Sequence, residues 1–226
     1  MALYDIAFRR EVTFLAVCII IGAGERLGPA PRPEDGDLLI AADGGYLWCL
    51  ELGLRPHLLI GDFDSLNGDL PPDIETVRLA VDKDDTDMSA AIEAGWQQGF
   101  RRFHLHGGTG GRLDHTLGNL QLIAGLAQRG GVGLLFDRDC AATAISDGGS
   151  VRFPAGSAGT VSVFACAGTA TGVWEEGLHF PLADATLESG FPLGVSNRLT
   201  GERARISVGA GTLLILYPHG VTPCFE

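Results

Sequence analysis

The sequence predicts an α/β protein with a larger, mostly parallel α/β domain over residues 1–137 and a smaller all-β sandwich domain over residues 138–226. Up to about Phe136, short apolar runs alternate with helical segments, which is typical of strands joined by crossover helices. After about Asp137 the runs are short and β-rich, and no helical pattern separates them. With 46% hydrophobic and 19% charged residues, the 226-residue chain has enough apolar material for a globular core.

The alternation in the first domain predicts its strands and helices in order. We expect strands at residues 12–21, 38–42, 57–60, 76–81, 103–106 and 132–136, and helices at residues 45–52, 87–98 and 113–129. Helical crossovers between strands give a mostly parallel, Rossmann-like sheet. Ligands of such sheets bind beyond the carboxyl ends of the strands, so the residues that follow each run are the first candidates for a functional site.

The second domain is predicted from apolar runs at residues 151–153, 160–164, 204–208 and 212–217. Gly, Pro, Asp and Ser separate these runs, as expected for turns between short strands. We therefore expect a sandwich or partial barrel that packs closely on the first domain.

Charge and cysteine content narrow the function classes. A net charge of -12 disfavours nucleic acid and anionic membrane as partners, and favours a cationic or metal-bound ligand. The longest apolar stretch, residues 12–21, is shorter than the roughly 20 residues of a membrane helix, and we interpret it as a buried strand. The five cysteines are scattered and form no C-x-x-C pair, which fits a reducing cytoplasm.

The first candidate motif, GDFDS, directly follows the expected strand 57–60 and contains Asp62 and Asp64. In an extended chain these two carboxylates share a face, and they repel each other unless a cation or proton lies between them. Such oxygen ligands suit Mg²⁺ together with substrate phosphates. The alternative is a polar turn in which Asp64 or Ser65 caps a helix.

The second motif, DKDDTD at residues 82–87, precedes an expected helix. Asp85 or Thr86 is a suitable N-cap, and acidic residues are favoured at a helix N-terminus. Four carboxylates within six residues exceed what one cap requires, which indicates a second metal-facing cluster.

The third motif, HGGTGGRLDH at residues 106–115, joins a strand to a helix. Its glycines allow backbone N–H groups to approach an anion, and Arg112 adds a forked phosphate donor. In the helix that follows, His115 and Asn119 share a polar stripe, whereas residues such as Leu113 and Leu117 are expected to form the apolar face that packs on the sheet.

Together these segments resemble the thiamine pyrophosphokinase family. The matching stretches are ADGG at residues 42–45, PHLLIGDFDSL at 56–66, KDDTD at 83–87, GGTGGRLDHTLGN at 107–119 and GVSN at 194–197. They occur in the family's order and span most of the chain. The resemblance implies a catalytic α/β domain that binds ATP and Mg²⁺, a thiamine-binding β-sandwich, and a homodimer whose thiamine sites lie between subunits.

The resemblance also implies roles for individual residues. Metal binding falls to Asp62, Asp64, Asp84 and Asp87, and catalysis to Asp62, Asp64, Asp87, Arg112 and Asp114. Nucleotide binding falls to Asp43, Gly44, Gly45, Gly108, Thr109, Gly110, Gly111, Arg112, His115 and Asn119. Thiamine binding falls to Phe180, Ser196 and Asn197, with Phe180 at a position where the family usually has Trp or Tyr.

The expected reaction is in-line attack of the thiamine hydroxyl on the β-phosphorus of ATP, with AMP as the leaving group. Asp64 and Asp114 are both candidates to orient or deprotonate the hydroxyl. The alternatives are a pyrophosphokinase for another heterocyclic alcohol such as a pterin, a phosphohydrolase using Asp62 and Asp64, and a non-enzymatic nucleotide or thiamine sensor.

Overall fold

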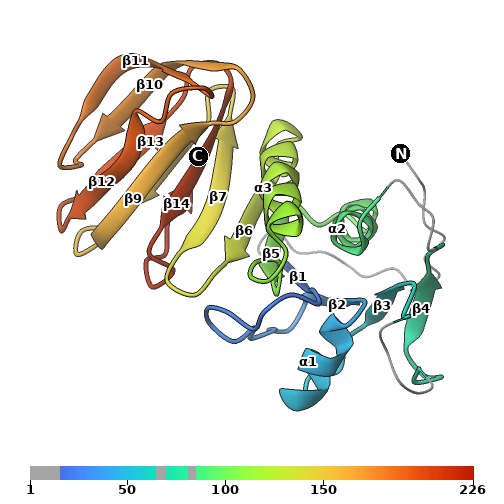
Figure 1. Ribbon diagram of the computed structural model, residues 1–226. Coiled ribbons are helices and arrows are strands. Elements are labelled where there is room, and N and C mark those ends of the chain that lie inside the picture. The colour runs from blue at the N-terminus through green and yellow to red at the C-terminus, as the bar shows by residue number, and fades with distance from the viewer. Residues whose placement is uncertain (1–15, 65–69, 81–84) are drawn as a thin grey trace. The chain divides into compact units, whose positions relative to one another are not determined.

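The computed structural model describes residues 16–64, 70–80 and 85–226 (Figure 1). The chain forms two compact units, Met1–Asn119 and Leu120–Glu226, which divide within a helix. The boundary at residues 137/138 that we expect from the change in sequence pattern lies further along the chain and stays a prediction.

The first unit contains a parallel sheet. Its strands are β1 (Cys18–Ile21), β2 (Leu38–Ala42), β3 (Leu58–Gly61), β4 (Glu75–Arg78) and β5 (Arg102–His106), paired in the order β5-β1-β2-β3-β4. The helices are α1 (Gly45–Glu51), α2 (Asp87–Gln97) and the start of α3 (Leu113–Gln128). The predicted alternation and parallel pairing are therefore confirmed, although residues 12–15 and 81 of the expected strands lie outside the described part of the chain.

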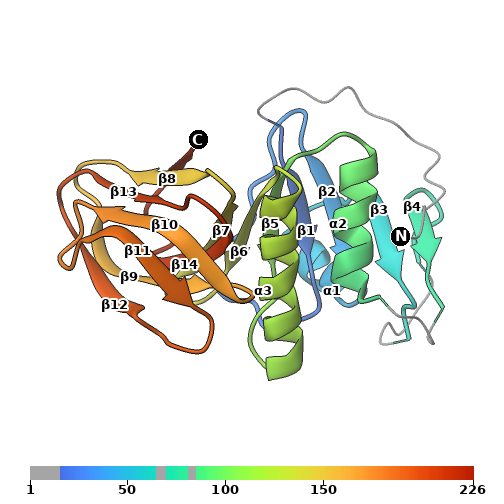
Figure 2. The same ribbon diagram turned by 90° about the horizontal axis from the view of Figure 1, so that it is seen from above.

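Strands β1, β2 and β3 are buried on both faces, which explains their continuous apolar sequences. Ile19 and Ile21 of β1 point into a cluster with Trp48 and Cys49 of α1. Cys18, on the other face, lies against α2, where a side chain at Gly95 would meet its sulfur. Figures 1 and 2 accordingly show α1 and α2 on opposite sides of these strands.

The second unit contains two groups of antiparallel strands. One has the order β12-β9-β14-β7-β6 and the other the order β11-β10-β13-β8-β15. The strands are β6 (Val132–Phe136), β7 (Ala141–Ser146), β8 (Ser150–Phe153), β9 (Ala158–Ala165), β10 (Thr169–Glu176), β11 (Leu182–Glu188), β12 (Gly194–Thr200), β13 (Ala204–Ser207), β14 (Thr212–Tyr217) and β15 (Cys224–Phe225). Side chains of both groups form one hydrophobic core, which includes Phe153 and Tyr217 in edge-to-face contact.

Strand β6, which we expect in the α/β domain, falls within the second unit and lies between β5 and β7 in the strand order. Not every strand of this unit was predicted. Strands β7, β10, β11, β12 and β15 lie outside the apolar runs that we used to locate strands. Strand β10 (TATGVWEE) shows the reason, because it alternates buried with exposed residues and carries Gly and Glu.

Candidate active site

A cleft of about 940 Å³ lies at the carboxyl ends of the parallel strands in the first unit. Its volume falls in the range of small-molecule sites. The loops after β1, β2, β3 and β5 and the N-terminal ends of α2 and α3 supply its lining. The sequence-predicted residues that line it are Asp43, Asp62, Asp87, Gly108, Thr109, Gly110, Gly111, Arg112, Asp114, His115 and Asn119.

Three carboxylates converge at this edge of the sheet. Asp43 follows β2, and Asp62 and Asp64 follow β3; one ligand oxygen of each lies within 4.8 Å of the others. Asp43 and Asp62 are half-buried, whereas Asp64 is exposed. This set of hard oxygen donors fits Mg²⁺. The prediction placed Asp43 with the nucleotide, and the structure brings it into the acidic cluster as well.

The backbone around the cluster is not the extended segment that we expected. Phe63 adopts a left-handed conformation with φ of 60°, and its side chain is buried in the core beside α1. The N–H of Asp64 donates to Oδ1 of Asp62 at 3.2 Å. A tight turn anchored by Phe63, rather than strand alternation, therefore brings the two carboxylates together.

The carboxylates of this cluster repel one another. The pKa of the Asp64 carboxyl is raised above its usual value, first by the charge of Asp62, with smaller contributions from burial and from Asp43 and Asp87. A cation among these groups relieves the repulsion.

The N-terminus of α2 forms the next part of the cleft. Thr86 is the N-cap, and its Oγ1 accepts a hydrogen bond from the N–H of Ser89 at 3.1 Å, which confirms one of the two expected caps. Asp87 occupies the first turn of α2. Both Asp87 and Asp85, which precedes the N-cap, line the cleft. Asp84, a predicted metal ligand, lies outside the described residues.

The glycine-rich loop after β5 packs closely against the loop after β1. Gly24 N–H donates to the carbonyl of Gly107 at 2.8 Å, and a Cβ at Gly24 would lie 2.6 Å from that oxygen. Asn119, buried on α3, donates from Nδ2 to the carbonyl of Gly108 at 2.6 Å. Gly111 N–H donates to Oε1 of Glu25 at 3.0 Å, so one loop N–H is held by a carboxylate.

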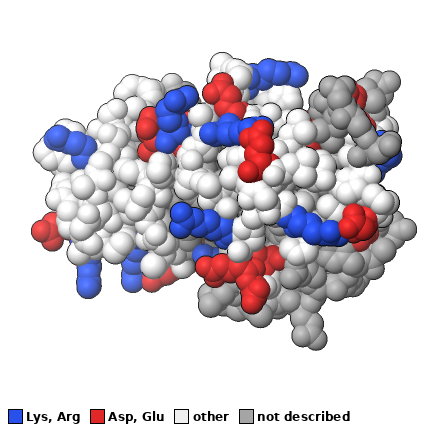
Figure 3. Space-filling model, turned by 90° about the horizontal axis from the view of Figure 1, so that it is seen from below, with Lys and Arg blue, Asp and Glu red and all other residues white. Residues whose placement is uncertain are grey.

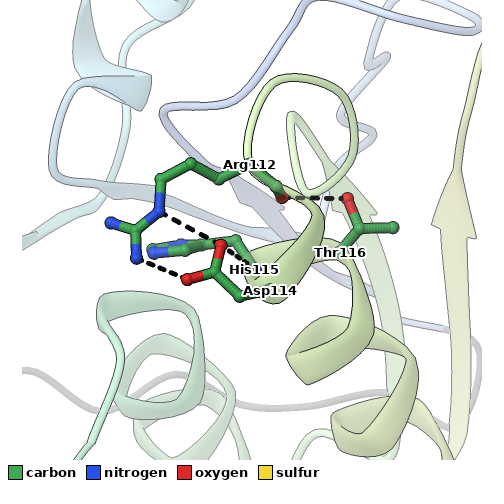
Figure 4. A network of polar contacts seen from close by, with 4 residues as sticks. All are labelled: Arg112, Asp114, His115 and Thr116. Atoms are coloured by element: carbon green, nitrogen blue, oxygen red, sulfur yellow. Dashed lines mark hydrogen bonds and ion pairs between the residues drawn. The ribbon is translucent and has the colours of Figure 1, made fainter.

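Arg112 and Asp114 form a forked ion pair at the mouth of the cleft (Figure 4). Nε of Arg112 lies 3.1 Å from Oδ1 of Asp114, and Nη2 lies 2.5 Å from Oδ2. The hydrogen bond from Arg112 holds the pKa of the Asp114 carboxyl at about 2, below its usual value. Both side chains are exposed, so this pair adds little stability, but it orients the guanidinium.

Some of the predicted nucleotide-binding residues have other surroundings. Gly44 is the N-cap of α1, and the buried Gly45 packs so tightly that a Cβ would overlap the carbonyl oxygen of Ile21. Neither is among the described residues that line the cleft. Leu113 and Leu117 of α3 are exposed rather than packed, because the buried face of this helix begins at Asn119 and continues through Ile123 and Leu126.

The prediction did not assign several residues of the cleft lining: Gly22, Ala23, Gly24, Glu25, Ala42, Asp85, Met88 and Gly118. The first four follow β1, at the carboxyl end of a predicted strand. That position marks this loop as a candidate part of the functional site.

The three residues expected at thiamine lie in the second unit. Phe180 and Ser196 are exposed, whereas Asn197 is buried. Asn197 contacts Phe180 directly, since Nδ2 donates to the carbonyl of Phe180 at 2.7 Å and Oδ1 accepts from its N–H at 2.9 Å. Their roles toward thiamine stay predictions.

Comparisons with known proteins agree with this arrangement. Residues 33–131 match the family model "Thiamin pyrophosphokinase, catalytic domain", and residues 151–213 match "Thiamin pyrophosphokinase, vitamin B1 binding domain". The thiamine pyrophosphokinase of Bacillus subtilis (strain 168) is 32% identical over 112 residues, which are 46% of this chain and 52% of that protein. The aligned segment thus spans about half the length of this relative.

Solved structures extend the likeness over the whole fold. The crystal structure of thiamine pyrophosphokinase from Bacillus subtilis superposes with a TM-score of 0.79 at 23% identity, over 90% of this chain and 98% of that one. The crystal structure of thiamin pyrophosphokinase from Geobacillus thermodenitrificans gives a TM-score of 0.77 at 30% identity, over 90% of this chain and 97% of that one. With both family models matched and this second structure covered almost completely, the chain belongs to the thiamin pyrophosphokinase family.

Proposed function

We propose that this protein transfers the terminal diphosphate of ATP to the hydroxyl of thiamine, giving thiamine diphosphate and AMP. In this reaction the thiamine oxygen forms a bond to the β-phosphorus, the bond from that phosphorus to the oxygen bridging to the α-phosphorus breaks, and the hydroxyl proton leaves to a base. The observation that carries the proposal is one cleft lined by Asp43, Asp62, a glycine-rich loop and Arg112. Asp64 is not part of this lining, but one of its carboxylate oxygens lies within 4.8 Å of those of Asp43 and Asp62.

The chain's own groups account for binding of the triphosphate. The glycine-rich loop presents backbone N–H groups at the start of α3, and this geometry favours phosphate oxygens. Arg112 offers a fork that matches two phosphate oxygens. Asp114 already bonds to Arg112 through both of its oxygens, so we assign it to orienting the guanidinium rather than to accepting the proton.

Asp43, Asp62 and Asp64 would hold Mg²⁺, with Asp84 and Asp87 as further predicted ligands. When bound there, the ion would neutralise negative charge on the phosphate groups of ATP. The oxygen donors and their mutual repulsion support this assignment.

Thiamine recognition is proposed for the second unit, with Phe180 as the aromatic contact and Ser196 as a hydrogen-bonding residue. A homodimer with composite sites, ATP as co-substrate and a cytoplasmic location complete the proposal. On the face shown in Figure 3, basic and acidic side chains both occur, and the basic ones do not gather into one continuous area. Within the described residues, no helix is long and apolar enough to span a bilayer.

The test is AMP release by the purified protein with ATP, Mg²⁺ and thiamine, each omitted in turn. We expect AMP and thiamine diphosphate in equal amounts, and neither when any component is missing. Release of inorganic phosphate without thiamine would instead indicate a phosphohydrolase, and turnover of a pterin alcohol in place of thiamine would indicate a different acceptor.

A further inference from the structure

The side chain of Asn197 makes a complete set of hydrogen bonds inside the protein. Oδ1 accepts from the N–H groups of Phe180 at 2.9 Å and Arg198 at 2.8 Å. Nδ2 donates to the carbonyl of Phe180 at 2.7 Å and to Oε2 of Glu175 at 2.8 Å. A carboxamide has two donor hydrogens and two acceptor sites, so all four are in use. The residue is 4% exposed, and its amide has no group left for a ligand.

These bonds extend a series of main-chain contacts between residues 178–179 and residues 198–199. In the turn between β10 and β11, Leu178 forms a bridge with Leu199, and His179 N–H donates to the carbonyl of Arg198 at 3.0 Å. At Phe180 the side chain of Asn197 replaces the main chain, with an acceptor for its N–H and a donor for its carbonyl. The Phe180 side chain is 60% exposed and meets the ring of His179 edge-on, with the ring centroids 4.4 Å apart. The bonds to Asn197 fix the main chain from which this side chain projects.

A bulge in β12 turns Asn197 inward. Between Gly194 and Asn197 the strand advances three residues while its partner β9 advances two, from Val163 to Val161. Ser196, at the bulge, has φ of 61°, and its N–H donates to Oγ of Ser162 at 3.1 Å. Extra residues of this kind redirect the side chains of a strand. Val195 and Ser196 are consequently both exposed, and Asn197 points into the interior.

Glu175 of β10 supports the amide from behind. This residue is fully buried, and one of its oxygens accepts from Asn197. Its other oxygen has no hydrogen-bond partner among the described residues. Burying a carboxyl group that has one hydrogen-bond partner is unfavourable. The hydrogen bond to Asn197 is the contact that gives Glu175 a structural role at this buried position.

We propose that Asn197 is a positioning residue, held by Glu175, that fixes the main chain of Phe180 and does not itself bind thiamine. We call the two hydrogen bonds from Asn197 to the main chain of Phe180 the clamp. The link to thiamine rests on the proposed function, whereas the clamp does not. Asn197 therefore acts on the ligand through the aromatic side chain that it holds in place.

Hydrogen exchange in the full-length protein without ligand tests the clamp. In Asn197→Ala we expect the Phe180 amide to exchange about five- to tenfold faster, as for loss of one hydrogen bond, while amides in β14 stay unchanged. Thr200→Ala is the matched control, because Thr200 Oγ1 also donates into this turn, at the carbonyl of Gly177, but does not touch Phe180. Unchanged exchange of Phe180 in Asn197→Ala would overturn the proposal.

A second pair of variants covers the case in which Asn197→Ala does not fold. Glu175→Gln retains an oxygen that accepts from Asn197, whereas Glu175→Leu removes it. We expect faster Phe180 exchange and a higher thiamine KM in the Leu variant, with the Gln variant close to the wild type. Equal behaviour of the two variants would exclude a role for Glu175 in orienting the amide.

A double-mutant cycle separates positioning from direct binding. We expect Asn197→Ala and Phe180→Ala each to raise the thiamine KM, with the ATP KM within about twofold of the wild type. The double variant should resemble Phe180→Ala alone, because the clamp has nothing left to position. Additive effects would show that Asn197 contacts thiamine itself. If the protein does not turn over thiamine, the proposed function fails, and hydrogen exchange still decides the clamp.

Discussion

Asp64 is exposed to solvent and lies beside two other carboxylates, Asp43 and Asp62. Its neighbours Asp62 and Asp43 hold its pKa above the usual value, and its carboxylate makes no contribution to the hydrophobic core. A change at this residue therefore separates chemistry from folding.

We expect Asp64→Asn to lower kcat by at least about 100-fold, because it removes a charge that holds the cation opposite the phosphates. The circular dichroism spectrum should match the wild type, and the midpoint of urea unfolding should stay at or slightly above the wild-type value, because the change relieves like-charge repulsion. Asp139→Asn, at an exposed carboxylate in the turn after β6, is the control and should retain full activity. A kcat above about a tenth of the wild type would exclude the metal role.

Arg112 presents a fork that already engages two oxygens of one carboxylate. We expect Arg112→Lys to be nearly as damaging to kcat/KM for ATP as Arg112→Ala, because a lysine cannot contact two oxygens with the same planar geometry. Steady-state kinetics at varied ATP would check this. Wild-type kinetics in the lysine variant would mean that position 112 supplies positive charge alone.

Glu175 should make the free energy of unfolding depend on pH. Burial raises its pKa from 4.5 to about 6. Between these values the folded chain binds more protons than the unfolded chain, so this group's contribution to stability falls as pH rises, by about 2 kcal/mol in total. Glu175→Gln should remove that loss, and the variant should gain stability relative to the wild type between pH 4.5 and pH 7.

Urea unfolding of both proteins across this range would test the prediction. The half-buried His104 and the buried His106, whose pKa values are lowered to about 4 and about 3 by loss of solvation, favour stability at higher pH and so oppose Glu175. Both proteins contain them, and the difference between the two curves cancels their effect. A difference that does not change with pH would contradict the shifted pKa.

At the scale of single elements, α2 shows how one segment serves both folding and the site. Thr86 caps the helix, and the same end places Asp85 and Asp87 at the cleft. The capping pattern predicted this start from sequence because it depends on residues only three positions apart.

We expect Thr86→Ala to lower the free energy of unfolding by about 1 kcal/mol, the usual effect of losing an N-cap hydroxyl. Thr86→Ser retains the hydroxyl and should recover most of the loss. Denaturant unfolding of the three proteins measures both differences. Equal stability of the alanine and serine variants would show that the Ser89 N–H finds another acceptor.

At the scale of the whole molecule, the metal and phosphate residues lie in the first unit and the proposed thiamine residues in the second. The proposed homodimer with composite sites predicts complementation between defective variants. At a thiamine concentration well below the KM of Phe180→Ala, Asp64→Asn and Phe180→Ala should each have little activity as homodimers, because every site carries one defect. In a mixed dimer both defects fall in one site, and the other site is intact.

Refolding the two variants together in equal amounts should make about half of the dimers mixed and restore about a quarter of wild-type activity. Mass spectrometry of the intact assemblies would establish that mixed dimers form. Mixed dimers without recovered activity would mean that each site is built within one chain, or that both sites must be intact.

The parallel sheet, its helices and the loops of the cleft were predictable from sequence because local patterns control them. Apolar runs such as residues 38–42, the cap at Thr86 and the glycines after β5 each depend on neighbours in the chain. The carboxyl ends of parallel strands meet at one edge, so Asp62 and Arg112 were expected in one cleft. Strands β10 to β12 were not predicted, since their half-exposed sequences lack an apolar run.

Tertiary structure alone decided which polar groups are available to a ligand. By sequence Asn197 is an ordinary candidate for hydrogen bonding, and only the bulge in β12 and the contact with Glu175 show that its amide is already saturated. Likewise Asp43 reaches Asp62 and Asp64 from a different strand, because β2 pairs with β3. Residue types and local spacing determine what chemistry is possible, whereas contacts between distant segments determine which atoms remain free to perform it.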